Sequence, residues 1–292
     1  MKNSPFFSII IPTYNRSDII EKTLQSVLNQ TFENFELIIV DDGSTDDTKE
    51  TVSNIFDKRL IYFKIENRER GAARNEGTKI TRGKYVTFLD SDDLLLPTHF
   101  EEAYKFIRNH HPIIFHQQYQ IVSQHNTKKI KLSESISKAL LRGNPLSCIG
   151  VFIKRKFAVK NLFIEDRKLS GTEDYELWLR YAAKYPFLYN PVCTSSLIIH
   201  EDRSVFNFNE KELLNRRDLL LKELKNNPSF ILKYKTKGLK RIESNMNTYV
   251  ALHLALSKSN NKLVIKYFLA GVKGSVQELF SRRTLAIIKR LL

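Results

Sequence analysis

The chain has 292 residues, which is enough for one large α/β domain with an appendage or for two modest domains. Hydrophobic residues make up 42% of it and charged residues 27%, while Gly and Pro number only 10 and 8, so a collagen-like or largely disordered chain is excluded. The formal net charge of +15 is uneven, because residues 205–292 hold 18 Lys and Arg against 6 Asp and Glu, whereas residues 1–204 hold 29 against 26.

The N-terminal segment indicates no export signal. Its apolar run, Phe6–Ile11, is shorter than a signal h-region and is followed directly by Pro12. No stretch of the sequence reaches the ~18 apolar residues of a spanning helix. The two cysteines, Cys148 and Cys193, lie in apolar contexts typical of buried free thiols. We therefore expect a protein made and kept in the cytoplasm.

The first hundred residues alternate strand and helix patterns. Apolar runs of strand length predict four strands, at Phe7–Ile11, Phe35–Val40, Leu60–Ile65 and Tyr85–Leu89. Helical spacing or helix-start signals predict helices from about Asp18, from about 46 to Phe56, at Gly71–Ile80 and from Pro97 to about Asn109. Strands separated by helices predict an α/β fold with a mostly parallel central sheet.

Polar segments follow three of these strands, at residues 12–15, 41–43 and 90–93. Ligands of open α/β sheets bind beyond the carboxyl ends of the strands, so the three segments are expected to converge on one rim. The pattern is less regular from Phe115 to His200, where strands are predicted at Cys148–Lys154 and Leu197–His200 and a helix at Thr172–Lys184. Beyond Val205 the pattern is helical and rich in lysine.

The acidic segment at residues 90–93 could hold a divalent cation. A departing nucleotide diphosphate carries negative charge that a hard cation such as Mn²⁺ or Mg²⁺ neutralises, and such cations prefer oxygen ligands. Asp92 is placed to bind the metal, while Asp90 could hydrogen-bond a ribose, with Ser91 between them. The alternative is an acidic helix N-terminus that the helix dipole favours.

Other residues near the same rim could contact a nucleotide. Asp42 could accept a hydrogen bond from the imide N–H of uracil, and Tyr14 could stack on a base. Arg74, beside Asn75, could contact phosphate. The alternatives are an ordinary turn around Gly43 for Asp42, a half-buried aromatic ring for Tyr14 and a surface ion pair for Arg74.

Four motifs together resemble one family. SIIIPTYNRS, FELIIVDDGSTD, ARNEG and YVTFLDSDD, in this order and spacing, are similar to the inverting family-2 glycosyltransferases of the GT-A fold, over residues 6 to about 204. The resemblance implies transfer of a sugar from a nucleotide diphosphate donor, most simply UDP, to an acceptor hydroxyl. It implies a catalytic domain at 1–204, with a nucleotide-sugar half at about 1–110 and an acceptor half at about 111–204, and a basic helical segment at 205–292.

The resemblance also implies roles for individual residues. Donor contacts come from the segment Pro12, Thr13 and Tyr14 and from Asp42, while Asp92 binds the metal and Asp90 lies on the ribose side. An acidic pair opening a later helix, Glu173 and Asp174, matches the element that holds the catalytic base, with Asp174 as the base. Without the resemblance, the same pair can be explained as acidic residues in the first turn of a helix, where the helix dipole favours them. His200, near a predicted strand end, could complete the metal site or be an ordinary polar strand end.

Two departures from the family pattern have consequences. Glu69 stands where the family usually has a glycine two residues after an asparagine such as Asn67, which puts contacts from that loop in doubt. The Gln-x-x-Arg-Trp element of processive, membrane-embedded members is absent, which indicates one sugar per event. By analogy with similar bacterial enzymes, the expected acceptor is a lipid-linked glycan intermediate of a surface polysaccharide.

Two other functions compete with this one. A sugar nucleotidyltransferase would carry a Gly-rich phosphate loop after the first strand, and residues 12–16 contain no glycine. A nucleic-acid-binding protein is suggested by the basic C-terminal third, but that segment shows no recognised motif with interleaved aromatics, so we expect no nucleic-acid partner.

The last seventeen residues resemble an interfacial helix. On a helical wheel the apolar residues of 276–292 gather on one half, and Arg282, Arg283, Lys289 and Arg290 on the other. With the charge asymmetry, this predicts peripheral binding to an anionic membrane surface on its cytoplasmic side. The alternative is a terminal helix docked on its own domain.

Overall fold

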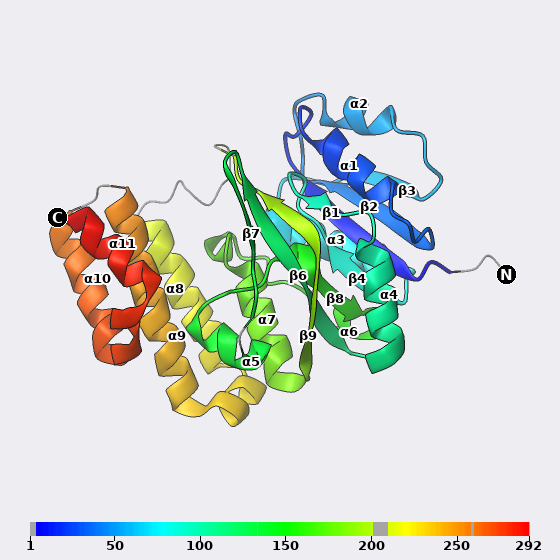
Figure 1. The fold of residues 1–292 in the computed structure, drawn as a ribbon. Helices are drawn as coiled ribbons and strands as arrows, with labels where there is room; N and C mark the ends of the chain where they lie inside the picture. The colour runs from blue at the N-terminus through cyan, green and yellow to red at the C-terminus, as the bar shows by residue number, and fades with distance from the viewer. Residues whose placement is uncertain (1–3, 133, 201–209, 258–259, 292) are drawn as a thin grey trace. The chain divides into compact units, whose positions relative to one another are not determined.

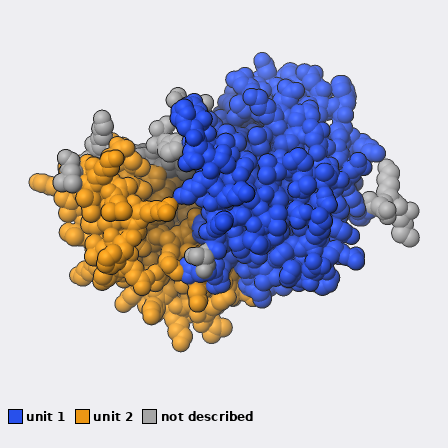
Figure 2. Space-filling model, viewed as in Figure 1, with its two compact units in different colours: residues 1–136, 145–167, 185–202 blue, residues 137–144, 168–184, 203–292 orange. Residues whose placement is uncertain are grey.

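The computed structural model describes residues 4–132, 134–200, 210–257 and 260–291. They form two compact units, coloured separately in Figure 2. Unit 1 is Met1–Ile136, Pro145–Arg167 and Tyr185–Asp202, and unit 2 is Ser137–Asn144, Lys168–Lys184 and Arg203–Leu292. The domain boundary expected between residues 204 and 205 falls within 201–209, outside the described residues.

Unit 1 is built on a nine-stranded sheet in the order β3-β2-β1-β4-β8-β6-β9-β5, with β7 beside β6 (Figure 1). The four strands β3, β2, β1 and β4 are parallel to one another, as the sequence predicts. The elements of this half are β1 (Phe7–Thr13), α1 (Ile20–Leu28), β2 (Phe35–Asp41), α2 (Thr48–Ser53), β3 (Leu60–Lys64), α3 (Glu69–Ile80), β4 (Tyr85–Phe88) and α4 (His99–His110).

Strand β1 is apolar on both faces because each face is covered. Ile9 and Ile11 belong to a core cluster that includes Leu24 of α1 and Phe100 of α4. On the other face, α3 lies so close that a Cβ at Gly77 would come within 2.5 Å of the Ile10 side chain. Coverage of both faces explains the continuous apolar runs that identified these strands.

The second half of the sheet differs from its prediction. Its elements are β5 (Leu94–Leu95), β6 (Ile114–Ser123), β7 (Asn126–Lys129), β8 (Val151–Lys154), α6 (Arg155–Ala158) and β9 (Phe187–Ile198). The strand expected at Cys148–Lys154 begins only at Val151, after a 3₁₀ turn at Cys148–Gly150. The strand expected at Leu197–His200 begins ten residues earlier and ends at Ile198. Strands β6 and β7 were not predicted.

Strand β6 and most of β9 were not predicted because buried polar side chains interrupt their apolar patterns. Gln117 is fully buried, and its side-chain oxygen accepts a hydrogen bond from Asn190 Nδ2 of β9 at 2.9 Å. Its amide nitrogen donates to Thr194 of the same strand. Because β8 runs antiparallel to both β4 and β6, the complete sheet is mixed.

Unit 2 is helical, and no strand lies among its described residues. Its longest helix, α9 (Pro228–Leu256), packs against α7, α8, α10 and α11. The other elements are α5 (Ile136–Ala139), whose first residue belongs to unit 1, η1 (Leu140–Arg142), η3 (Arg167–Leu169), α7 (Glu173–Lys184), α8 (Glu210–Lys225), α10 (Asn261–Gly274), η5 (Val276–Phe280) and α11 (Arg282–Leu291). The predicted helix at Thr172–Lys184 is therefore confirmed as α7.

The tail is not the single amphipathic helix that the wheel assumed. Ser281 is extended, with φ −78° and ψ 149°, and separates the 3₁₀ turn η5 from α11. Its hydroxyl then caps α11 by accepting the Thr284 N–H at 3.2 Å. Ile287 is fully buried in the core of unit 2, whereas Phe280 is 87% exposed. Among the described helices, none is both long and apolar enough to cross a bilayer.

Candidate active site

The loops after β1 and β2 are joined at the carboxyl edge of the sheet. Asn15, held at φ +49°, donates its backbone N–H to Ser44 Oγ at 2.9 Å and accepts the Thr45 N–H on Oδ1 at 2.8 Å. Tyr14 next to it is 47% exposed. The predicted rim segments after β1 and β2 are thus in direct contact. The exposed ring of Tyr14 lies at the same edge of the sheet.

The adjacent aspartates of the second loop have different environments. Asp41 is fully buried and accepts hydrogen bonds from the Ser44 N–H at 2.7 Å and the Tyr62 hydroxyl at 2.6 Å. Asp42 accepts the Arg68 N–H at 2.7 Å. Burial raises the pKa of Asp42, and the backbone N–H groups of Arg68 and Glu69 oppose this rise. Asp41 therefore supports the loop, while Asp42 faces the 67–69 segment.

Thr13 lies beside Asp42. Its carbonyl oxygen accepts the Asp42 N–H at 2.8 Å, and Pro12 before it is buried in β1. Thr13 Oγ1 is buried and has no hydrogen-bond partner within the described part of the protein. A buried hydroxyl without a partner is costly, which makes the Thr13 hydroxyl a candidate contact for a ligand at the same edge.

The loop with the unexpected glutamate adopts the conformation that a glycine would favour. Glu69 has φ +74°, in the left-handed region. Asn67, two residues earlier, donates from Nδ2 to the Asp42 carbonyl at 2.9 Å, and Arg167 Nη2 donates to Asn67 Oδ1 at 2.8 Å. The substitution for glycine has thus kept the turn, and the loop still contacts the Asp42 segment.

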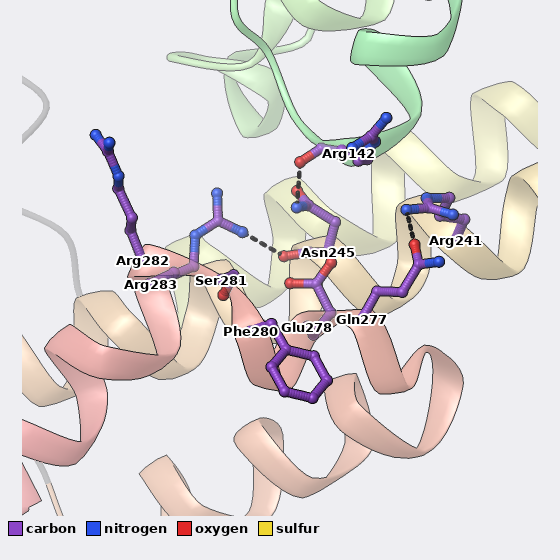
Figure 3. Close-up of a pocket in the computed structure, with 9 residues that line it drawn as sticks. All are labelled: Arg142, Arg241, Asn245, Gln277, Glu278, Phe280, Ser281, Arg282 and Arg283. Carbon is purple, nitrogen blue, oxygen red and sulfur yellow. Dashed lines mark hydrogen bonds between the residues drawn. The ribbon is translucent and has the colours of Figure 1, made fainter.

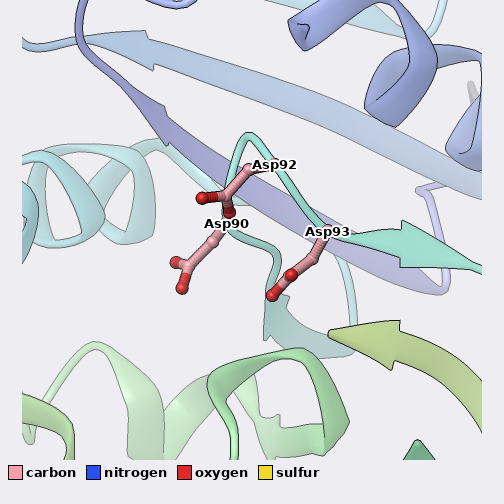
Figure 4. A group of neighbouring side chains, drawn as sticks. All are labelled: Asp90, Asp92 and Asp93. Carbon is pink, nitrogen blue, oxygen red and sulfur yellow. The ribbon is translucent and has the colours of Figure 1, made fainter. Parts of the chain in front are cut away.

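The acidic segment forms a compact cluster. Asp90, Asp92 and Asp93 each bring a carboxylate oxygen within 4.8 Å of the others. Figure 4 shows the three side chains on one short stretch of the chain. Asp92 Oδ2 lies 2.9 Å from His200 Nε2, and Asp93 Oδ1 accepts the Ile198 N–H of β9 at 2.9 Å. Ser91, between Asp90 and Asp92, is buried, and its carbonyl oxygen accepts a hydrogen bond from the Thr23 hydroxyl at 3.0 Å. The structure therefore brings together the two predicted metal ligands, Asp92 and His200, although they are far apart in the sequence.

These donors fit a hard or borderline divalent cation. Carboxylate oxygens suit Mg²⁺ and Mn²⁺, and an imidazole nitrogen is a ligand that first-row transition metals accept. Asp93 is fully buried and bound to the backbone of β9, so it anchors the cluster to the sheet. Asp92 and Asp90, which are only partly buried, are the carboxylates that can reach an ion.

Two residues predicted to contact the nucleotide-sugar, Arg74 and Asn75, bind other residues of the protein instead. Arg74 is 1% exposed and pairs through Nη2 with Asp90 Oδ1 at 2.6 Å. Asn75, also 1% exposed, donates to the Phe163 carbonyl at 2.9 Å and accepts the Phe163 N–H at 2.8 Å. Arg74 thus orients a carboxylate of the cluster, and Asn75 fixes the 163–165 segment.

The acidic pair predicted to hold the base lies in unit 2, at the start of α7. Glu173 is 4% exposed and accepts the Gly171 N–H at 2.6 Å. Asp174 is partly buried and accepts the Tyr175 N–H at 2.7 Å and the Asn144 side-chain amide at 3.0 Å. Glu173 therefore supports the turn that precedes the helix, whereas Asp174 keeps a more accessible carboxylate.

Comparison with known proteins identifies the family. Residues 8–169 match the model of glycosyl transferase family 2. The chain belongs to this family. Family membership favours sugar transfer over the nucleotidyltransferase alternative.

Curated relatives resemble this glycosyltransferase over about three fifths of its length. An uncharacterized glycosyltransferase of Rickettsia felis is 38% identical over 187 residues, covering 61% of this chain and 30% of that protein. A UDP-Glc:alpha-D-GlcNAc-diphosphoundecaprenol beta-1,3-glucosyltransferase of Escherichia coli, WfaP, is 36% identical over 181 residues, covering 61% of this chain and 70% of that protein. The matches span less than a third of the length of the relatives from R. felis, R. conorii and R. bellii.

Solved structures establish the GT-A fold of this family member. S. aureus TarS, residues 1–349 in complex with UDP-GlcNAc, has a TM-score of 0.64 at 20% identity and covers 94% of this chain and 91% of that one. The mannosyltransferase PcManGT of Pyrobaculum calidifontis, in complex with GDP-Man and Mn²⁺, has a TM-score of 0.57 at 16% identity and covers 99% of this chain and 86% of that one.

Sequence reasoning missed three residues that shape the site. Tyr62 holds Asp41, while Asn67 and Arg167 hold the loop against Asp42. Tyr62 lies in a predicted strand, where nothing marked its hydroxyl for a role. Asn67 and Arg167 are 100 residues apart, so their contact left no local signal. The only signal for Asn67 was its position two residues before Glu69, where the family pattern was interrupted.

Proposed function

We propose that this family-2 enzyme transfers a sugar from a UDP-sugar to a hydroxyl of a lipid-linked glycan, with inversion at the anomeric carbon. The observation that carries the proposal is the cluster of Asp90, Asp92 and Asp93, with His200 against Asp92, at the sheet edge that also holds Thr13 and Asp42. Mn²⁺ or Mg²⁺ held by Asp92 and His200 would neutralise charge on the departing diphosphate.

The residues around Asp42 suit a uracil base. In this proposal the Asp42 carboxylate accepts the imide N–H, Thr13 Oγ1 gains the partner it lacks within the described protein, and Tyr14 stacks on the ring. Arg74 keeps Asp90 directed toward the ribose through their 2.6 Å ion pair. Asp174 takes the proton of the acceptor hydroxyl as that oxygen attacks the anomeric carbon.

The donor is tested by calorimetric titration of UDP, GDP, CDP and ADP, with Mn²⁺ and with EDTA. We expect UDP to bind most tightly, and at least about tenfold more tightly with Mn²⁺ than with EDTA, because a hard cation bridges carboxylate and diphosphate oxygens. Preference for another nucleotide would contradict the uracil assignment. Equal affinity with Mn²⁺ and EDTA would contradict the metal assignment.

The acceptor and the location of the enzyme belong to the same proposal. The name of WfaP gives its acceptor as alpha-D-GlcNAc-diphosphoundecaprenol, a lipid-linked sugar. A lipid-linked acceptor for this chain would place the reaction at a membrane surface. Unit 2 supplies both kinds of contact that an anionic bilayer binds, cationic residues and the exposed side chains Val276, Phe280 and Leu285. We therefore propose peripheral binding to the cytoplasmic membrane face through unit 2.

Vesicle binding is best tested by point substitution, because deleting 276–292 would also remove the buried Glu278, Thr284 and Ile287. Phe280→Ser should weaken binding to phosphatidylglycerol vesicles at least about fivefold, since an inserted Phe contributes on the order of 1.5–3 kcal/mol. Phe56→Ser, at a 96% exposed site in unit 1, is the matched control and should bind as the parent does. Equal binding to phosphatidylcholine vesicles at low salt would end the membrane proposal.

A further inference from the structure

Unit 2 contains a pocket of about 760 Å³ whose lining includes none of the residues assigned to the transfer reaction. Residues from η1, α9, η5 and the start of α11 line it, as Figure 3 shows. Its lining includes four arginines and one acid: Arg142, Arg241, Arg282, Arg283 and Glu278. The lining therefore has a net formal charge of +3.

Contacts within unit 2 fix the position of the innermost arginine. Arg283 Nη1 donates to the Asn245 carbonyl at 2.9 Å and to Thr248 Oγ1 at 3.1 Å (Figure 3 shows the first). The side-chain amide of Asn245 donates in turn to the Arg142 carbonyl. Because both partners of Arg283 lie on the long helix α9, its guanidinium is positioned before any ligand arrives.

Gly143 allows the chain to approach this cluster. It has φ +131°, and a Cβ there would lie 3.3 Å from Asn245 Oδ1 and 3.8 Å from Arg283 Nη2. A side chain at this position would be strained and would crowd the two groups. The close approach brings η1, with Arg142, beside the start of α11.

Among the residues that line the pocket, four arginines face a single acid. Glu278 is 6% exposed and accepts the Thr248 hydroxyl at 2.9 Å. Burial lowers the pKa of Arg283, and the charge of Glu278 opposes that shift. A neighbouring pocket of about 360 Å³ shares Arg241 and adds Lys237 and Lys240, so positive charge continues along α9.

We propose that the arginine pocket of unit 2 binds a diphosphate or phosphate ester group. A planar guanidinium donates two parallel hydrogen bonds to a phosphate, and several guanidinium groups around one pocket match a multiply charged oxyanion better than a single carboxylate. The group can come from a soluble phosphate ester or from a lipid headgroup, and both present the same oxygens. The proposal needs no metal and does not depend on the donor or the sugar.

The first test is calorimetric titration of the full chain with inorganic pyrophosphate in EDTA. The variant Arg241→Gln/Arg282→Gln removes two pocket cations, and Lys289→Gln/Arg290→Gln removes two exposed cations of α11 that do not line the pocket. We expect the pocket variant to bind pyrophosphate at least about tenfold more weakly than the parent and the control variant to bind as the parent does. Thermal unfolding of each variant verifies that unit 2 is intact.

A second arm distinguishes the sources of the phosphate. The same proteins are sedimented with vesicles of phosphatidylglycerol in phosphatidylcholine. Pyrophosphate binding without pocket-dependent vesicle binding assigns the site to a soluble phosphate ester, whereas pocket-dependent vesicle binding assigns it to a headgroup. Equal losses in the two variants, or binding of neither probe by the parent, would overturn the proposal. Retained binding of UDP with Mn²⁺ by the pocket variant separates this result from the donor site.

Discussion

Asp92→Asn is expected to lower transfer about 1,000-fold or more, a loss of roughly 4 kcal/mol of transition-state stabilisation. The substitution removes an anionic oxygen from the cluster while preserving side-chain shape. It should also abolish the tightening of UDP binding by Mn²⁺, because that tightening requires a carboxylate ligand. Initial rates with a UDP-sugar donor and calorimetry with UDP measure the two effects separately.

The control for this variant is Asp47→Asn, which removes an exposed carboxylate at the start of α2 and should leave both measurements unchanged. His200→Gln should give an intermediate loss, since His200 Nε2 lies 2.9 Å from Asp92 and adds one ligand of several. Near-normal rates for Asp92→Asn in Mg²⁺ or Mn²⁺ would show that the metal assignment is wrong.

Asp174→Asn is expected to reduce turnover about 100-fold or more and to leave UDP affinity nearly unchanged. An amide cannot accept the acceptor proton in the transition state, but its oxygen can still accept the Tyr175 N–H. The split between turnover and donor affinity separates a missing base from a damaged donor site. Steady-state rates and calorimetry on one protein preparation provide both numbers.

Glu173→Gln is the matched control, one residue away in the same helix. Its amide oxygen can still accept the Gly171 N–H, so the turn before α7 should persist and activity should stay near that of the parent. Full activity in Asp174→Asn together with none in Glu173→Gln would transfer the catalytic role to Glu173. Equal loss of turnover and UDP affinity in Asp174→Asn would indicate a structural or donor-site role.

The parallel half of unit 1 and its rim were predictable because their signals are local. Strands buried on both faces are continuously apolar, and the direction of parallel strands then places the segments after β1, β2 and β4 at one edge. The same rule predicts from the sequence that Asp42 and Asp92 lie at this edge. It could not predict that Asp41 supports the loop, because that role depends on a hydroxyl from β3.

The remaining features depend on partners distant in sequence. Strands β6 and β9 bury Gln117 and Asn190 against each other, which removes the apolar signal from both. The inward side of α7 was visible as an apolar stripe, but a stripe does not identify its partner helices in unit 2. Arg74 was predicted to contact phosphate or to form a surface ion pair, because nothing near it in the chain indicates its burial beside Asp90.

The pairing of Asp92 with His200 also has a consequence for the order of synthesis. The imidazole lies 108 residues after the carboxylate, beyond β9, and β9 pairs with β5 just after the acidic cluster. At ~5–20 residues per second, the ribosome makes His200 about 5–20 seconds after Asp92. Strands β1 to β4 are complete well before that, so the nascent chain can assemble the carboxylate edge of the sheet while His200 is still to be synthesised.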